Sequence, residues 1–514
     1  MPHPRSIRSV ALLAAGGLAL ALVLYLPWER RPFDILDFSE FVPLLRAHAG
    51  FVDRMTALVH YYVVEHGRLN VTAYAALAAK WTVLGDAPVR WQWLRFALMA
   101  LLAGGAFGLA RRLGANLVGA GAAALLFLCG HTAVEAWTRL TMGEPMGLLF
   151  LFGAAFAADR YLREDDRWRA PVIALLITLA LLSKEMLLGA VPFVLVLALA
   201  RDEQGQFGRL AFGPRSRRLL WWTGGASALT LGAIFWAARS GAGAGFSASY
   251  GAGPLDLMRF PNLWQQILTP AGISPTLGVW LLPANLAWLL LVVVGTWVAW
   301  RAKDRRPHLV ILIGLAAGLP AIGAALYLPW PYFNLFYGLP FLIGPALLLA
   351  EAVTTLSQDG IECRVLASGG LVVLLGFAGA TAGRTARAAA VRQQVNGALA
   401  RMLPAYATAD SIVVAEPRPA QQQWQGTGPT LVRYALAFGL TEHLPPATDA
   451  GCAVVGRAMG GAPTRTVFIT YSDRCGRFAT APRRIIGVYR YLDWLRPGLV
   501  VDSLEADVAG PTAP

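Results

Sequence analysis

Long apolar segments recur along this chain of 514 residues, and they constrain its fold more than any other feature. Between residues 92 and 383 they alternate with short polar links. Hydrophobic residues make up 56% of the sequence and charged residues only 14%, whereas a soluble domain carries about 25% charged residues. Because about 20 apolar residues span a bilayer as a helix, the sequence predicts an all-α polytopic membrane protein.

The apolar segments predict about eleven membrane crossings. A first run at residues 10–26 is not followed by a small-residue cleavage site, so we expect it to remain as the first helix. The later crossings are predicted at about residues 92–110, 115–134, 143–160, 170–183, 185–200, 219–238, 279–300, 308–328, 333–351 and 364–383. The two segments on either side of Lys184 are short for spanning, so we expect tilted or broken helices there.

The basic residues predict an orientation in the membrane. The formal net charge is +14, and arginine supplies nearly all of the base, since lysine occurs only at Lys80, Lys184 and Lys303. Such a charge on a soluble protein would suggest nucleic acid, but these arginines gather in short links between apolar segments. Arginine-rich links mark the cytoplasmic side, so the pattern predicts a cytoplasmic N-terminus and no nucleic-acid partner.

Two long links are predicted on the outer face. Residues 28–90 form a large first outer loop, with amphipathic helices expected at residues 41–57 and 72–84 in the membrane interface. Residues 240–278 are rich in Gly, Ala, Ser and Pro and are interpreted either as a substrate-gated lid or as a flexible connector. Together with the crossings, these loops define a predicted transmembrane domain over residues 1–387.

From about residue 388 the chain becomes polar, which predicts a small C-terminal α/β domain over residues 388–514 on the outer face. Its expected strands and helices are bounded by Gly and Pro. The strands are predicted at residues 411–415, 452–455, 465–471 and 484–491, and the helices at residues 388–402 and 430–438. Cys452 and Cys475 could form a disulfide if this region faces an oxidising compartment.

Three carboxylates, Asp34, Asp37 and Glu40, follow the first apolar run. If this stretch is helical, residues spaced by three share a face, so all three could point at one site. Carboxylates near a membrane are costly unless they have a function, which favours Asp37 as a catalytic base. The alternative is that Asp37 or Glu40 caps the amphipathic segment that follows.

Further charged residues fall on the same predicted outer side. Arg139 and Glu144 flank the start of the segment at residues 143–160, and a helix N-terminus beside a cation suits a phosphate. Lys184 and Glu185 lie between two apolar runs. Interfacial ion pairs or snorkelling side chains would also explain each pair. Their location on the side of the acidic loop favours a shared site.

The order of these motifs resembles the GT-C superfamily of polytopic glycosyltransferases, in particular bacterial relatives of protein O-mannosyltransferases and lipid A aminoarabinose transferases. The resemblance is closest over residues 1–200. It depends on the acidic loop followed by HGRLNVTAY at residues 66–74, LGDAPVR at residues 84–90 with Arg95, TMGEP at residues 141–145, and LSKE at residues 182–185.

The resemblance implies a transferase that moves a sugar from a polyprenyl-phosphate donor to a lipid, glycan or protein acceptor. It implies an outer-face site in a bacterial inner membrane, with periplasmic exposure of the C-terminal region. Asp37 matches the first-loop acid, with Glu40 and Asp34 beside it. Lys184 matches a turn near the donor phosphate. Pro331-Tyr332 stands where relatives often have Arg-Tyr, so Arg139 or Arg68 is expected to supply the missing phosphate contact.

The acids Glu144 and Glu185 are expected to orient the acceptor or to bind a divalent cation through oxygen ligands. The sequence contains no metal-type Cys or His spacing, no P-loop and no dinucleotide fingerprint, so no cofactor is predicted with certainty. A transporter or flippase of lipid-linked saccharides is the alternative function. Transporters usually show internal repeats and charges near the bilayer midplane, whereas here no repeat is evident and the charges gather at one face.

Overall fold

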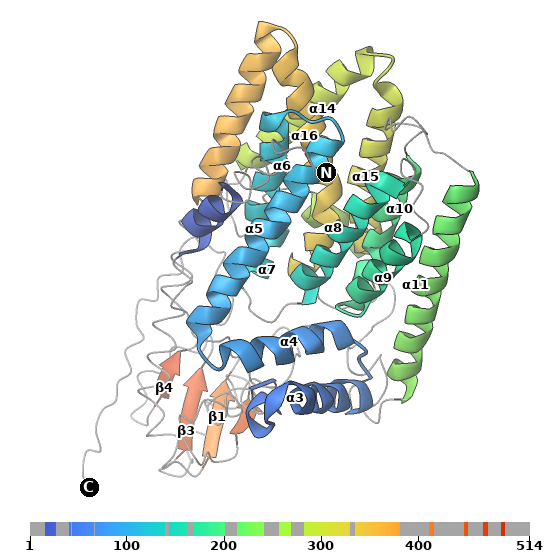
Figure 1. Cartoon of the computed structure of the whole chain (residues 1–514). Coiled ribbons are helices and arrows are strands. Elements are labelled where there is room, and N and C mark those ends of the chain that lie inside the picture. The colour runs from blue at the N-terminus through green and yellow to red at the C-terminus, as the bar shows by residue number, and fades with distance from the viewer. Residues whose placement is uncertain are drawn as a thin grey trace. The chain divides into compact units, whose positions relative to one another are not determined.

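The structure is a computed structural model of the chain (Figure 1). It describes residues 16–26, 41–42, 44–65, 67–138, 143–161, 168–200, 213–240, 256–268, 282–328, 335–380, 411–415, 447–450, 466–470 and 485–488. The chain forms two compact units. The first comprises residues 1–26, 58–85 and 90–383, and the second comprises residues 27–57, 86–89 and 384–514.

The first unit is built from apolar helices. Within the described residues, six helices are long and apolar enough to cross a membrane: Pro88–Arg112, Pro214–Arg239, Pro283–Arg301, Arg306–Leu326, Tyr337–Gln358 and Ile361–Ala380. Shorter apolar helices are Gly16–Tyr25, Val71–Leu84, Leu117–Cys129, Arg169–Leu181 and Glu185–Leu199. The chain is therefore an integral membrane protein, while the total of about eleven crossings stays a prediction.

One helix, α16 (Ile343–Gln358), lies at the centre of this unit and is buried from Ile343 to Leu356. It packs against α6 (Leu117–Cys129), α14 (Leu282–Arg301) and α15 (Arg306–Leu326). A second group packs α8 (Gly143–Tyr161) against α9 (Arg169–Leu181) and α10 (Val191–Leu199). Helix α5 (Pro88–Arg112) approaches α8 closely at Gly105. A Cβ atom at this position would lie only 2.9 Å from the Phe152 ring.

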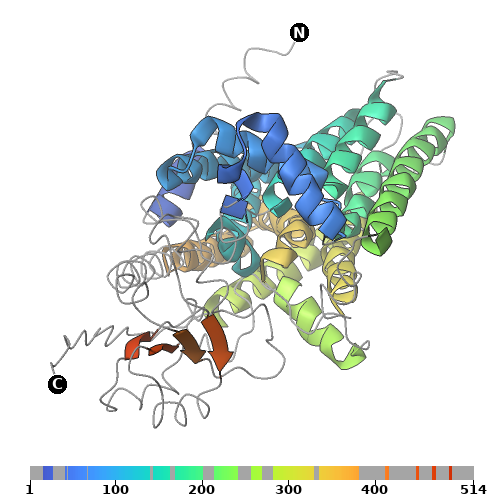
Figure 2. The same cartoon turned by 90° about the horizontal axis from the view of Figure 1, so that it is seen from below.

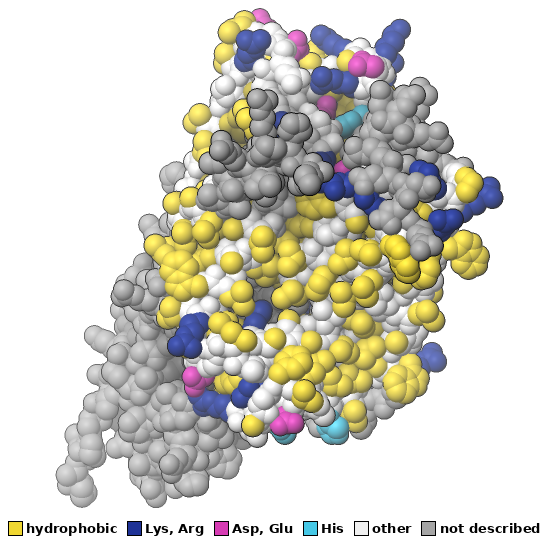
Figure 3. Space-filling model, viewed as in Figure 1, with side chains coloured by type: hydrophobic (Ala, Val, Ile, Leu, Met, Phe, Trp, Pro, Cys, Tyr) yellow, Lys and Arg dark blue, Asp and Glu magenta, His cyan; other side chains and the backbone are white. Residues whose placement is uncertain are grey.

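The outer surface of the helices is apolar, as expected for contact with lipid. Helix α11 (Pro214–Ser240) packs on α9 and lies at the edge of the bundle in both views (Figures 1 and 2). Its Leu229, Phe235 and Trp236 are more than half exposed. Figure 3 shows hydrophobic side chains covering the middle of the visible face, with Lys and Arg side chains gathered toward the ends of the helices. Such a band suits the hydrocarbon layer.

Two of the predicted crossings are broken in the structure. The segment at residues 115–134 divides at Gly130 into α6 and α7 (His131–Thr138). The segment at residues 333–351 begins as the 3-10 helix η6 (Leu335–Leu342) and continues as α16. The chain also breaks between α9 and the 3-10 helix η3 (Glu185–Ala190), as the short apolar runs predicted.

Parts of the predicted outer loops are helical and belong to the first unit. Helix α4 (Val71–Leu84) runs across the direction of α5 and α11 (Figure 1), which fits the predicted interfacial helix at residues 72–84. Within the predicted loop 240–278, the short turn η4 (Leu257–Arg259) leads into α13 (Phe260–Leu268). Helix α13 packs on α15 and η6 and buries Leu263 and Ile267.

The second unit contains a four-stranded parallel sheet with strand order β2-β1-β3-β4. The strands are β1 (Ser411–Ala415), β2 (Ala447–Ala450), β3 (Thr466–Thr470) and β4 (Ile485–Val488). Three of them fall on predicted strands, whereas residues 452–455 lie outside the described residues, as do Cys452 and Cys475. The chain between the strands is also outside them, so the α/β character and the boundary at residue 387 stay predictions.

The second unit also holds part of the first outer loop. Residues 41–42 and 44–47 are helical, and α3 (Gly50–Val59) follows after a break at Gly50, whose φ is +79°. Only glycine adopts such a φ readily, which explains why the predicted helix at residues 41–57 is interrupted. Arg46 forms an exposed ion pair with Asp86 at 3.1 Å.

Candidate functional site

The candidate site of the first unit is centred on Lys184, in the break between α9 and η3. Its Nζ atom lies 3.9 Å from Oε1 of Glu144 and 3.9 Å from Oε1 of Glu185. The side chains are 16%, 3% and 13% exposed respectively. Lys184 has an extended backbone, with φ −163° and ψ 122°, so its side chain is presented by an irregular segment between two apolar helices. Two carboxylates and an ammonium group thus meet in a largely buried position.

Glycine allows Glu144 to reach this position. Glu144 lies in the first turn of α8, directly after Gly143. A Cβ atom on Gly143 would lie 2.5 Å from the Ser183 carbonyl oxygen, a separation that real Cβ atoms do not adopt. The absence of a side chain at residue 143 therefore lets the start of α8 contact the Ser183 backbone beside Lys184.

The segment before α4 forms another side of the site. The backbone N–H of Thr72 donates to the Leu182 carbonyl at 3.0 Å and ties the start of α4 to the end of α9. Asn70 is the N-cap residue of α4, but its side chain makes no cap hydrogen bond and instead lies close enough to the Glu185 carboxylate to favour its charged form. Arg68 lies near enough to Glu185 to stabilise its charged form.

These neighbours keep Glu185 ionised. Glu185 precedes α10 and lies outside the six long apolar helices. Burial raises the pKa of its carboxyl, but the charges of Lys184 and Arg68, a backbone hydrogen bond and the Asn70 side chain together lower it below the usual 4.5. Glu185 is therefore an acceptor of hydrogen bonds at neutral pH.

Aromatic rings complete the surroundings of Lys184. Its Nζ atom lies 5.5 Å from the centroid of the Tyr337 ring, which belongs to η6. Tyr337 stacks on Tyr327, at the end of α15, with ring centroids 4.9 Å apart. Sequence analysis missed both tyrosines, because an aromatic residue near the end of an apolar segment is usually interpreted as part of the interfacial belt.

The arrangement suits the binding of an oxyanion next to a hydroxyl group. Both Lys184 distances exceed the 2.7–3.2 Å of an ordinary N–H···O hydrogen bond, so these two contacts are ion pairs. With Arg68, the site contains two cationic and two anionic groups. In a low-dielectric setting the cations attract a phosphate strongly, and a carboxylate can accept the proton of a hydroxyl.

The predicted site residues fall into two sets. Arg68, Lys184, Glu144 and Glu185, which lie far apart in the sequence, come together in the structure. Asp34, Asp37, Glu40 and Arg139 lie outside the described residues. In the part of the chain that the structure describes, no group of three or more His, Cys, Asp or Glu side chains could hold a metal ion. The divalent cation therefore stays a prediction.

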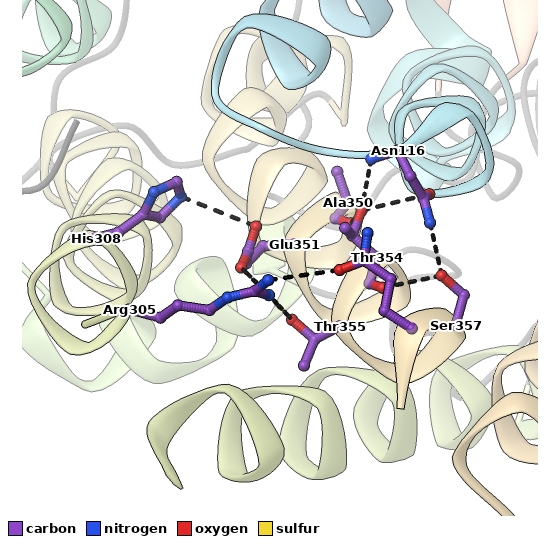
Figure 4. A network of polar contacts seen from close by, with 9 residues as sticks. Asn116, Arg305, His308, Ala350, Glu351, Thr354, Thr355 and Ser357 are labelled. Atoms are coloured by element: carbon purple, nitrogen blue, oxygen red, sulfur yellow. Dashed lines mark hydrogen bonds and ion pairs between the residues drawn. The ribbon is translucent and has the colours of Figure 1, made fainter. Parts of the chain in front are cut away.

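A second polar network joins α6, α15 and α16 (Figure 4). The backbone N–H of Asn116 donates to Oγ1 of Thr354 at 3.0 Å, and its amide donates to Oγ of Ser357 at 2.6 Å. The Asn116 side chain also caps α6 by accepting from the Gly119 N–H at 2.8 Å. A Cβ atom on Gly119 would lie 2.3 Å from the Ala350 carbonyl oxygen, so glycine permits this close approach of α6 and α16.

The same network includes a carboxylate, Glu351, in the interior of α16 (Figure 4). Its oxygens lie 3.7 Å from Arg305 Nη1 and 3.9 Å from His308 Nε2. Arg305 also donates to Oγ1 of Thr355 and to Oε1 of Gln358, both at 3.4 Å. These contacts link the start of α15 to α16 and satisfy the polar groups of a helix that is otherwise buried.

The fold and the Lys184 site define an integral membrane protein with a buried, charged site at the ends of broken apolar helices. No family model and no curated protein matches the chain. Its structure is similar to that of ArnT from Cupriavidus metallidurans bound to undecaprenyl phosphate. The identity is 13% and the TM-score 0.44, over 88% of this chain and 91% of that one.

A likeness of this extent does not establish a common function. The proposal below therefore depends on the residues of the Lys184 site.

Proposed function

We propose that the chain is a membrane glycosyltransferase that moves a sugar from a polyprenyl-phosphate donor to a hydroxyl or phosphate of a lipid, glycan or protein acceptor. The observation that carries the proposal is the meeting of Lys184, Glu144 and Glu185 beside the Arg68–Asn70 segment, in a unit of membrane helices. The proposed location is the outer face of the bacterial inner membrane, with a cytoplasmic N-terminus.

Lys184 and Arg68 are the proposed contacts of the donor phosphate, with Arg139 as a third. Transfer breaks the bond between the sugar C1 atom and the phosphate oxygen, so negative charge develops on the departing polyprenyl phosphate. Cations held in a buried site stabilise this charge more in the transition state than water does. The polyprenyl chain would lie against the apolar helices.

The acceptor oxygen attacks C1 and gives up its proton to a carboxylate. Asp37 is the proposed base, with Asp34 and Glu40 beside it in the same acidic stretch. Glu144 and Glu185 are proposed to orient the acceptor by accepting hydrogen bonds from its hydroxyl groups, or to bind a divalent cation. The proton, the sugar and the phosphate are then all accounted for without a further reactant.

The proposal is tested on membranes that contain the parent chain, Lys184→Met, Asp37→Asn or the control Lys303→Met. Lys303 is an exposed lysine in the turn between α14 and α15. Each membrane receives a panel of labelled polyprenyl-phosphate sugars, and released polyprenyl phosphate is measured by thin-layer chromatography. We expect release by the parent and the control, and loss of release in the other two variants.

Absence of release by the parent across the panel would contradict the proposal. Movement of the donor between leaflets without release would instead support a transporter. Full release by Asp37→Asn would leave the transferase intact and remove Asp37 as its base.

A further inference from the structure

A buried arginine that the proposed site does not include lies on α5. Arg95 is 6% exposed, and Gln92 on the same helix is fully buried. Residues three apart in a helix share a face, so the two side chains lie one above the other. Arg95 is seven residues from the start of α5 at Pro88, which corresponds to about 10 Å along the helix axis.

The hydrogen bonds of Arg95 leave one edge of its guanidinium group without a partner. Its Nη1 atom donates to the Trp137 backbone carbonyl, and the guanidinium group lies 5.1 Å from the Phe96 ring centroid. Its Nε and Nη2 atoms are buried and have no hydrogen-bond partner, and neither has either polar atom of the Gln92 amide. Among the described residues, no carboxylate forms an ion pair with Arg95.

An unpartnered buried cation is strongly destabilising, so a polar group of this kind inside a membrane protein indicates a ligand. Nε–H and Nη2–H are the two parallel donors of a guanidinium edge, and they match two oxygens of one phosphate or carboxylate. Anchoring Nη1 to the Trp137 carbonyl fixes the direction in which this pair of donors points. The Gln92 amide adds an N–H donor on the same face.

We propose that Arg95 and Gln92 form an oxyanion subsite that binds the phosphate group of a polyprenyl phosphate. A lipid phosphate fits better than a soluble anion, because both side chains lie within a long apolar helix and are closed off from solvent. Trp137 lies on α7, and α7 packs on η6, the helix that carries Tyr337 beside Lys184. The lipid's identity depends on the proposed function, whereas the oxyanion chemistry does not.

The test measures ligand-induced thermal stabilisation of the purified full chain in detergent. Parent, Arg95→Lys, Gln92→Leu and the control Arg112→Lys are titrated with polyprenyl phosphate, with the neutral polyprenol of equal length, and with inorganic phosphate. Arg112 is a suitable control because it lies on the same helix and already pairs with Asp159 at 3.1 Å. Lysine keeps the charge of Arg95 but cannot reproduce its two parallel donors.

We expect polyprenyl phosphate, and not polyprenol, to stabilise the parent and the control. The polyprenyl phosphate concentration that gives half-maximal thermal stabilisation should rise at least about tenfold in Arg95→Lys and a few-fold in Gln92→Leu. The subsite is refuted if Arg95→Lys titrates like the parent, or if polyprenol stabilises the parent equally. Should Arg95→Lys not fold, an unchanged titration of Gln92→Leu refutes it. If inorganic phosphate stabilises the parent but not Arg95→Lys, the oxyanion subsite is retained, and its ligand is free phosphate instead of a lipid phosphate.

These outcomes are distinct from those of the transfer assay. If the parent binds polyprenyl phosphate through Arg95 but releases none from a sugar donor, the subsite proposal stands and the proposed function is contradicted. If the parent releases polyprenyl phosphate while Arg95→Lys binds it as the parent does, the proposed function stands and the subsite proposal is contradicted.

Discussion

The first unit contains two charged clusters whose construction differs. Around Lys184, the ionic distances are 3.9 Å and the central residue lies in a break between helices. Around Glu351, the charged groups belong to regular helices or their first turns and are joined by hydrogen bonds to Thr355 (Figure 4). Arg305 also donates to Gln358. The first cluster is a charged site presented by irregular backbone, and the second ties three helices together.

We interpret this contrast as a difference between charge proposed for catalysis and charge used for packing. Within the hydrocarbon layer, irregular backbone is tolerated where its N–H and C=O groups are buried in protein or line a water-filled cavity. Such places are often ligand sites. The Glu351 network instead supplies a helix cap and side-chain hydrogen bonds between helices, which fix their register. Substitutions at the first cluster should therefore affect transfer, and those at the second should affect stability.

The largest expected effect concerns the carboxylates. We expect Glu144→Gln to lower transfer by about 100-fold, because the amide cannot carry the charge that orients an acceptor or balances Lys184. Glu351→Gln is the matched control and should retain transfer within about twofold. Initial rates of polyprenyl phosphate release in equal amounts of folded protein make the comparison. Equal losses in both variants would remove the distinction between the clusters.

A pair of glycines sharpens the contrast. Gly143→Ala places a Cβ atom against the Ser183 carbonyl and should move Glu144 away from Lys184, lowering transfer by about tenfold. Gly119→Ala meets the Ala350 carbonyl and should instead lower the free energy of unfolding by about 1–3 kcal/mol. Transfer rates and thermal unfolding of both variants distinguish the effects. A loss of transfer in folded Gly119→Ala without destabilisation would contradict this division.

A smaller effect is expected for the hydroxyl of Thr354, which accepts from Asn116 and donates to Ala350. Thr354→Val should cost about 1 kcal/mol of stability, since it leaves the Asn116 N–H without that acceptor. Denaturant unfolding in a constant detergent measures the change, with Thr296→Val on α14 as a control for threonine loss within a helix. Thr296 bonds only to carbonyls of its own helix.

The smallest effect concerns pH. Because the folded-state pKa of Glu185 is lowered below 4.5, its contribution to stability is present above the unfolded-state pKa and is lost as the pH falls through the folded-state value. The unfolding temperatures of the parent and Glu185→Gln should therefore differ at neutral pH and converge below pH 4.5. A difference that grows on acidification would show that the sign of the shift is wrong.

Much of the first unit could be predicted from the sequence, because hydrophobic length and charge distribution dictate where membrane helices form. The two apolar runs beside Lys184 are too short to span a bilayer and predict the break there. Arg68, Glu144 and Glu185 are also predicted from the sequence as site residues, and the structure brings them together. The breaks at Gly130 and at residue 343 were missed, since apolar composition continues through them.

The packing roles of other residues could not be predicted. Gly143 and Gly119 matter through atoms of distant segments, and Tyr337 approaches Lys184 only because η6 folds back on the bundle. Arg95 appeared in the sequence merely as part of a motif, and its two unpartnered donors became visible only with its neighbours in place. Three-dimensional proximity, which composition does not encode, decides each of these roles.

The central claim is that Lys184 serves transfer and not packing. Its most direct test is the rate at which labelled polyprenyl phosphate is released by the parent, Lys184→Met and Lys303→Met in matched membranes, with folding checked by thermal unfolding. The account predicts loss of at least about 100-fold in Lys184→Met alone, with all three proteins folded. Release by folded Lys184→Met at the rate of the parent would contradict it.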